Sequence, residues 1–220
     1  MKKPRISINK LGEYLTATPS RRKRIVEDQQ DPKPFITTRY GDAREQIVGY
    51  LVSDMTDDSA ILNAAESLKV HSGGTDFCEQ DRCASSEAIH SFLEASENLD
   101  LDGLVAAPVL SNESSTMDVA GVTISMRPDA ILKDKETGEV KGCVKLHFAK
   151  TAPLNAQAGE YVATALRVHL GNSHAAVDPH KCFVVDVPTK KIYNAPKAFK
   201  RKMNDISAAC EEIDVRWKKT

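Results

Sequence analysis

Hydrophobic residues recur with helical spacing over most of the first 70 residues. Leu11 and Tyr14 share one face of the first predicted helix, which Ser7 or Asn9 can cap and Pro19 interrupts. Three further helical segments are predicted in this part of the chain, at 20–30, 42–51 and 59–69. The pattern therefore indicates a helical N-terminal lobe.

Residues 71–82 interrupt the helical pattern with Gly73-Gly74 and mixed charges, which is typical of a loop. This loop is the best candidate for a boundary, so we expect an N-terminal helical lobe at 1–82 and an α/β core at 83–220. The core is predicted to open with a helix at 85–93, because Ile89 and Phe92 have helical spacing behind a serine cap.

The rest of the core alternates between strand-like and helical patterns. In the segment 140–148, Val144, Leu146 and Phe148 alternate with Lys145 and His147, as on a strand between two environments. The predicted strands are 104–110, 119–132, 140–148, 182–187 and 191–193, and the predicted helices are 153–170 and 195–217. Residues 135–138 supply a hairpin turn between the second and third strands. We therefore expect an α/β fold with a central mixed sheet flanked by helices.

Composition favours a globular protein with one core over a membrane protein or a disulfide-rich one. A chain of 220 residues with 41% hydrophobic and 28% charged residues is sufficient for one well-buried core. No run of 18 apolar residues is present, and the polar Asn9-Lys10 follows the basic start where a signal peptide would be apolar. The five cysteines are scattered, which favours reduced thiols over a disulfide framework. We expect a cytoplasmic protein with no membrane partner.

Asp129 and Lys145 are the first candidates for chemistry. Asp129 follows Pro128 at the end of the first strand of the predicted hairpin, and Lys145 lies on the second strand. Neighbouring antiparallel strands would bring the two side chains to one sheet edge. A carboxylate can bind Mg²⁺ there, and the lysine can orient a water or offset the charge of a phosphate. A simple cross-strand ion pair is the competing interpretation.

An ordered set of short motifs resembles the PD-(D/E)XK nuclease superfamily, in its RecB-like branch. The set covers roughly the last two thirds of the chain, together with the opening segment around Tyr14. The motifs occur in this order: Ser86–Glu94 around His90, Met126–Ile131 around Asp129, Gly142–Leu146 around Lys145, and Gln157-Ala158-Gly159-Glu160-Tyr161. The resemblance implies a nuclease fold in which His90 and Asp129 bind Mg²⁺ or Mn²⁺. It also implies Lys145 as the catalytic lysine, supported by Gln157 and Tyr161.

One position departs from the family pattern. Cys143 stands where the family has Asp or Glu two residues before the lysine, and a thiol is a poor ligand for Mg²⁺. Glu160 is the first candidate for a replacement acid, and Glu87 is the second. Glu139, in Glu139-Val140-Lys141, is a weaker alternative because that register would move the core residues of the strand.

Two clusters of basic residues can contact phosphates, since the net charge of −1 gives no global attraction to nucleic acid. They are Arg21, Arg22, Lys23 and Arg24, and Lys197, Lys200, Arg201 and Lys202. A solvated helix face is the ordinary interpretation of such clusters, and the nuclease resemblance favours DNA binding by the first.

The resemblance implies two alternative functions. The first is metal-dependent hydrolysis of DNA, for which the resemblance also implies a place in bacterial or phage DNA processing or antiviral defence. The second is a catalytically inactive nuclease fold that binds nucleic acid or joins a protein partner in a defence or repair complex.

Overall fold

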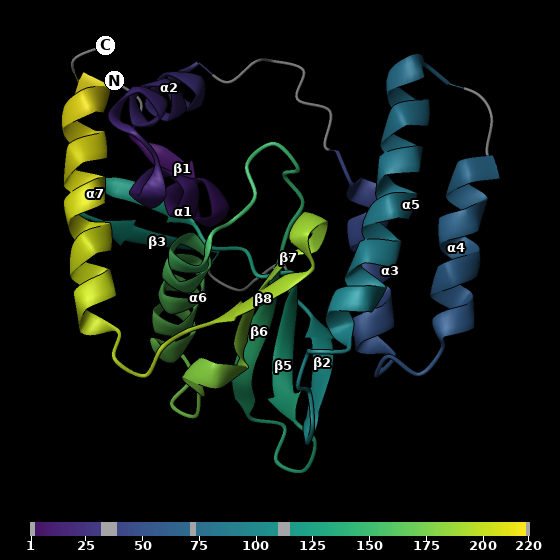
Figure 1. The fold of residues 1–220 in the computed structure, drawn as a ribbon. Coiled ribbons are helices and arrows are strands. Elements are labelled where there is room, and N and C mark those ends of the chain that lie inside the picture. The colour runs from purple at the N-terminus through teal and green to yellow at the C-terminus, as the bar shows by residue number, and fades with distance from the viewer. Residues whose placement is uncertain (1–2, 32–38, 71–73, 110–114, 219–220) are drawn as a thin grey trace.

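The computed structural model describes residues 3–31, 39–70, 74–109 and 115–218. It is an α/β fold with two sheets flanked by helices (Figure 1), which confirms the predicted class. The strands are β1 (Arg5–Ser7), β2 (Leu104–Pro108), β3 (Thr116–Val119), β4 (Val122–Ser125), β5 (Ala130–Asp134), β6 (Val140–His147), β7 (Cys182–Asp186) and β8 (Lys191–Asn194). The helices are α1 (Ile8–Thr16), α2 (Pro19–Gln30), α3 (Gly41–Val52), α4 (Asp58–Val70), α5 (Asp76–Ser96), α6 (Ala156–Gly171) and α7 (Lys200–Lys218), with short 3₁₀ turns η1 (Pro179–Lys181) and η2 (Val187–Thr189).

The first helices begin where their caps are. The Ser7 hydroxyl accepts a hydrogen bond from the backbone N–H of Lys10 and caps α1, as its place in the sequence predicts. Thr18 caps α2 in the same way, with Pro19 in the first turn. The expected helices at 42–51 and 59–69 correspond to α3 and α4.

The prediction of a loop at 71–82 is wrong for most of the residues that the structure describes there, because α5 begins at Asp76 and continues past residue 82. Thr75 caps this helix, and Asp76 and Glu79 place negative charge in its first turn, which stabilises a helix N-terminus. Ser85 and Ser86, the expected caps, are instead buried in the middle of the helix. The boundary suggested at residue 82 therefore lies inside α5, and the division of the chain into two units stays a prediction.

The larger sheet has the order β2-β5-β6-β7-β8. β5 and β6 form the expected hairpin, in which Gly138 adopts a positive φ of 69° in the turn. β6 and β7 are parallel, and α6 makes the crossover between them. The strand expected at 119–132 is wrong as a single element: β4 pairs with β1 and β3 in a separate three-stranded sheet, and only β5 joins the hairpin.

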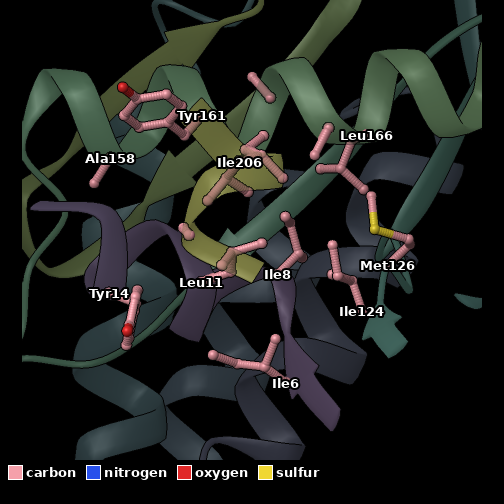
Figure 2. Packing of buried hydrophobic residues seen from close by; sticks show 14 of the residues in the cluster. Ile6, Ile8, Leu11, Tyr14, Ile124, Met126, Ala158, Tyr161, Leu166 and Ile206 are labelled. Atoms are coloured by element: carbon pink, nitrogen blue, oxygen red, sulfur yellow. The ribbon is translucent and has the colours of Figure 1, made fainter. Parts of the chain in front are cut away.

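The two faces of the larger sheet bury two hydrophobic clusters. Cys143 of β6 belongs to the cluster beneath α1, α6 and α7, whereas its neighbours Val144 and Leu146 belong to the cluster beneath α3 and α5. Figure 2 shows part of the first cluster, which includes Leu11 of α1, Ile124 of β4 and Leu166 of α6. The alternation predicted for β6 thus corresponds to two different cores.

The helices of the first 82 residues contribute to both faces. α1 packs on α6 and α2 on α7, whereas α3 packs on β2 and α5, and α4 packs on α5. The N-terminal segments are therefore part of the layers that cover the sheets. None of the helices in the described ranges combines the length and apolar character needed to cross a bilayer.

Candidate functional site

Asp129 and Lys145 meet at the start of β5. The carboxylate Oδ2 of Asp129 lies 3.0 Å from Lys145 Nζ and accepts a 2.7 Å hydrogen bond from the backbone N–H of Leu146. Lys145 Nζ also donates to the carbonyl of Arg127 at 2.7 Å. The two side chains are only 6% and 11% exposed, so the pair is nearly enclosed. The structure therefore brings together the two residues that the sequence placed at one edge.

Arg44 of α3 completes this centre. Its Nη1 donates to Oδ1 of Asp129, and its guanidinium lies over the ring of Phe148, 5.0 Å from the ring centroid. The Phe148 ring is also stacked with the ring of Tyr40, with 5.2 Å between the ring centroids and an interplanar angle of 12°. Sequence reasoning missed Arg44, because it lies 85 residues before Asp129 and no local motif marks it. We call Arg44, Asp129 and Lys145 the Asp129 centre.

Two cations therefore face one carboxylate. Burial lowers the pKa of the Lys145 ammonium, while the nearby Asp129 charge opposes that shift. With both cations charged, the centre carries one net positive charge. The Arg44 side chain is 37% exposed, so part of this charge is accessible from solvent. Such an arrangement can attract an anion without a metal ion.

Cys143 does not replace the missing acid. Its side chain is fully buried against Cys182 of β7, its partner in the parallel pairing. The contact with Cys182 and then burial raise the pKa of the Cys143 thiol well above its usual value. The residue is therefore a neutral core thiol at neutral pH, which is not a ligand for Mg²⁺.

His90 lies elsewhere, on the face of α5 that meets α4. Its Nε2 is 3.3 Å from Glu66 Oε1, and it lines an open cavity of about 520 Å³ with Tyr50 and Asp58. The contacts of Asp129 are instead with α3 and β6. The structure therefore does not bring His90 and Asp129 together as the two ligands of one ion.

The expected helix motif faces α7. The hydroxyl of Tyr161 donates to Asp205 at 2.7 Å, and the amide of Gln157 lies 3.5 Å from that hydroxyl. Glu160 pairs with Lys202 at 2.7 Å, and the same ammonium lies 4.6 Å above the Tyr161 ring. The three motif residues therefore form a network between α6 and α7, apart from the Asp129 centre.

The residues around Asp129 do not fit Mg²⁺ or Mn²⁺. Both carboxylate oxygens already have cationic partners, and the other expected ligand contacts Glu66. In the ranges that the structure describes, no three His, Cys, Asp or Glu side chains are grouped so that they could hold a metal ion. Hard divalent cations need several oxygen ligands, so one engaged carboxylate is insufficient.

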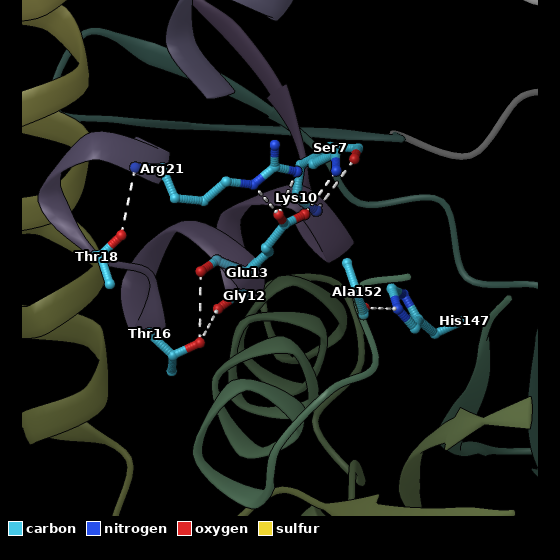
Figure 3. A network of polar contacts seen from close by, with 9 residues as sticks. All are labelled: Ser7, Lys10, Gly12, Glu13, Thr16, Thr18, Arg21, His147 and Ala152. Atoms are coloured by element: carbon cyan, nitrogen blue, oxygen red, sulfur yellow. Dashed lines mark hydrogen bonds and ion pairs between the residues drawn. The ribbon is translucent and has the colours of Figure 1, made fainter. Parts of the chain in front are cut away.

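The basic cluster at 21–24 is largely paired. Arg21 binds Glu13 through Nε at 2.7 Å, and Lys10 binds the other oxygen of that carboxylate at 2.6 Å (Figure 3). Burial raises the pKa of Glu13, but the hydrogen bonds from these two cations outweigh it and the net pKa is lowered. The remaining ion pairs of the cluster are Arg22 with Glu212 at 3.2 Å and Lys23 with Glu27 at 3.7 Å. Much of its charge is therefore neutralised within the protein, and DNA binding by this cluster stays a prediction.

A buried polar group lies beside α1. His147 of β6 is 6% exposed, and its Nε2 is 2.8 Å from the carbonyl oxygen of Ala152 (Figure 3). Its neighbour in the parallel register is Asp186, which accepts from the N–H of Leu154 and the hydroxyl of Thr189, both at 2.9 Å. Burial lowers the pKa of His147 and raises that of Asp186, so both favour the neutral form. These contacts tie the loop before α6 to the sheet.

A comparison of the chain with protein-family models and with curated proteins found no match. The geometry of the Asp129 centre is therefore the strongest ground for a function. It combines enclosed donors, one net positive charge and an arginine side chain that is partly exposed, which are features of sites that bind phosphate groups.

Proposed function

We propose that this chain is a nuclease-type α/β protein that binds DNA without cutting it, with Arg44 supplying the positive charge that a metal ion would supply in an active enzyme. The single observation that carries the proposal is the binding of both Asp129 oxygens by cations of the protein itself. A phosphate of the DNA backbone would contact the guanidinium of the partly exposed Arg44 side chain, because a planar guanidinium suits the geometry of phosphate oxygens.

The order of the core elements supports a nuclease-type fold. A helix (α5), three strands (β2, β5 and β6), the helix α6 and the strand β7 follow one another, with β3 and β4 inserted after the first strand. This is the order in which the nuclease-like motifs occur in the sequence. The same resemblance is the ground for proposing a cytoplasmic role in bacterial or phage DNA processing or defence, with DNA and a protein of a defence or repair complex as partners.

Active hydrolysis is less well supported, because it needs a second carboxylate near Asp129. All three glutamates that are candidates for this role are paired with lysines: Glu87 with Lys150 at 2.5 Å, Glu139 with Lys141 at 2.9 Å, and Glu160 with Lys202 at 2.7 Å. Glu160, the best of the three by sequence, belongs to the α6–α7 network. A non-cleaving binding protein therefore agrees better with the geometry.

The test measures DNA binding by fluorescence anisotropy in EDTA, over a range of salt concentrations. We expect binding that persists in EDTA and weakens linearly with the logarithm of salt concentration, as backbone contacts do. Arg44→Gln should lower the affinity by about tenfold and reduce the salt slope by about 1, as the loss of one phosphate contact does. Arg39→Gln is the matched control. It removes the same charge from an arginine that also lies over an aromatic ring, 5.0 Å from the centroid of Phe77.

Two outcomes would overturn the proposal. One is the absence of binding to single- and double-stranded DNA alike. The other is cleavage in Mg²⁺ or Mn²⁺ that Lys145→Met abolishes, since this would show an active nuclease at the same centre.

A further inference from the structure

A cavity of about 340 Å³ lies beside the Asp129 centre, because Phe148, which lines the cavity, is in contact with Arg44. The proposed function does not use this cavity. It is bounded by α5, by η2 and by the segment that follows β6. Tyr40 and Phe148 form its aromatic wall, Pro153 and Pro188 are among its apolar lining, and Ser91 lies on the α5 side. The volume is within the range of sites that hold small organic ligands, about 300–1,000 Å³.

The aromatic wall is connected directly to the Asp129 centre. Phe148 has the Tyr40 ring stacked at 5.2 Å and the Arg44 guanidinium at 5.0 Å. Tyr40 is itself held in place, because its backbone N–H donates to Asp81 Oδ1 at 3.0 Å. The cation that contacts Asp129 and the flat rings that line the cavity are thus parts of one stack. A ligand that bound to both Arg44 and the aromatic wall would need an anionic group next to a planar apolar group.

The rim of the cavity adds polar groups that can exchange partners. Lys150 and Glu87, which both line the cavity, form an ion pair at 2.5 Å, and their side chains are 51% and 63% exposed. Exposed pairs of this kind contribute little to stability, so they can open for a ligand at small cost. Together they offer a donor and an acceptor to the edge of a heterocycle.

We infer that this cavity takes one unpaired nucleobase of single-stranded DNA whose backbone phosphate contacts Arg44. The inference rests on the proposed function and adds the class of nucleic acid to it. Duplex DNA would not place a base there, because its bases are stacked and paired. Stacking on aromatic side chains is tolerant of sequence, so we expect little preference among bases.

The test compares a short oligothymidylate with an abasic backbone of the same length, which carries the same phosphates but no bases. The wild-type protein should bind the oligothymidylate more tightly by about tenfold, the size expected for one stacked base. Ser91→Phe places a ring in the cavity and should reduce oligothymidylate binding to the abasic level. This substitution leaves the Asp129 centre unchanged.

Ser67→Phe is the matched control. Ser67 of α4 donates its hydroxyl to the carbonyl four residues earlier, Asn63, as Ser91 does to Glu87, but it lies on an exposed surface away from the cavity. It should keep the preference for oligothymidylate. The comparison of the two oligonucleotides needs only the wild-type protein, so it holds even when the variants do not fold.

The outcomes separate the two proposals. Equal affinity of the wild type for both oligonucleotides, with binding that depends on Arg44, would overturn the nucleobase cavity and leave phosphate binding intact. Loss of all binding would overturn both. Preference for the oligothymidylate that Ser91→Phe does not reduce would place the base elsewhere and also overturn this inference.

Discussion

Removal of the Asp129 charge should destabilise the protein strongly, because the carboxylate is the counterion of a buried lysine. The Asp129 side chain is 6% exposed and that of Lys145 is 11% exposed, at a distance of 3.0 Å. Breaking such a pair by removing one partner costs about 3–5 kcal/mol. Asp129→Ala also leaves the backbone N–H of Leu146 without its acceptor, so we expect the upper part of this range.

Two further variants divide this loss into its parts. Asp129→Asn keeps an oxygen for Leu146 but removes the charge, so it should cost about 2–3 kcal/mol. Adding Lys145→Met to Asp129→Asn should recover part of that loss, because the uncompensated buried cation is then gone. The coupling between the two substitutions is expected to be about 1–3 kcal/mol.

The assay is urea unfolding at pH 7 in EDTA, followed by circular dichroism and compared with Asp118→Asn. Asp118 pairs with Lys3 at 2.8 Å, but the two side chains are 63% and 55% exposed, so little change is expected there. Unchanged or increased stability of Asp129→Asn would refute the reasoning. It would mean that the carboxylate is strained in the free protein, as expected of a ligand that lacks its metal ion.

Two other predictions concern stability away from this centre. Glu13→Gln should cost about 1–2 kcal/mol at pH 7, since it weakens charge-assisted hydrogen bonds to two partly exposed cations. Because the folded pKa of Glu13 is lowered below 4.5, the stability from its charge is present above that value and lost as the pH falls through the folded pKa. The free energies of unfolding of the wild type and of Glu13→Gln, measured in urea, should therefore become equal below the folded pKa of Glu13. A difference that persists in acid would contradict the assignment of this stability to the Glu13 charge. Gly142→Ala should cost about 2–3 kcal/mol, because its Cβ would lie 1.9 Å from the carbonyl oxygen of Lys181. Gly171→Ala, with nothing within 4 Å, should change the melting temperature little, and equal effects of the two would refute the steric argument.

Local pattern was sufficient for several elements of the fold. The alternation around Val144 and Leu146 identifies β6 as a strand between two cores, and the structure assigns its two faces to separate clusters. The Ser7 cap, the hairpin turn at 135–138 and the two strands β7 and β8 were also predictable. Each of these features depends on side chains close together in sequence.

The candidate site was only partly predictable. Asp129 and Lys145 are separated by a hairpin, so strand geometry alone places them together. His90 and Glu160 were expected near them by motif order, yet each is paired on another surface. Motif order specifies which element carries a residue, whereas the direction of a helical side chain depends on the rotation of the helix against its neighbours.

The sequence by itself therefore determined the types and order of most elements, the α/β class and the pair at the hairpin. Tertiary structure decided the rest: β4 joins a second sheet with β1, and Arg44 reaches Asp129 from a helix 85 residues earlier. The physical reason is that periodicity reports contacts over a few residues. Pairing between distant segments is decided by which surfaces pack together, and here that packing placed a guanidinium beside Asp129.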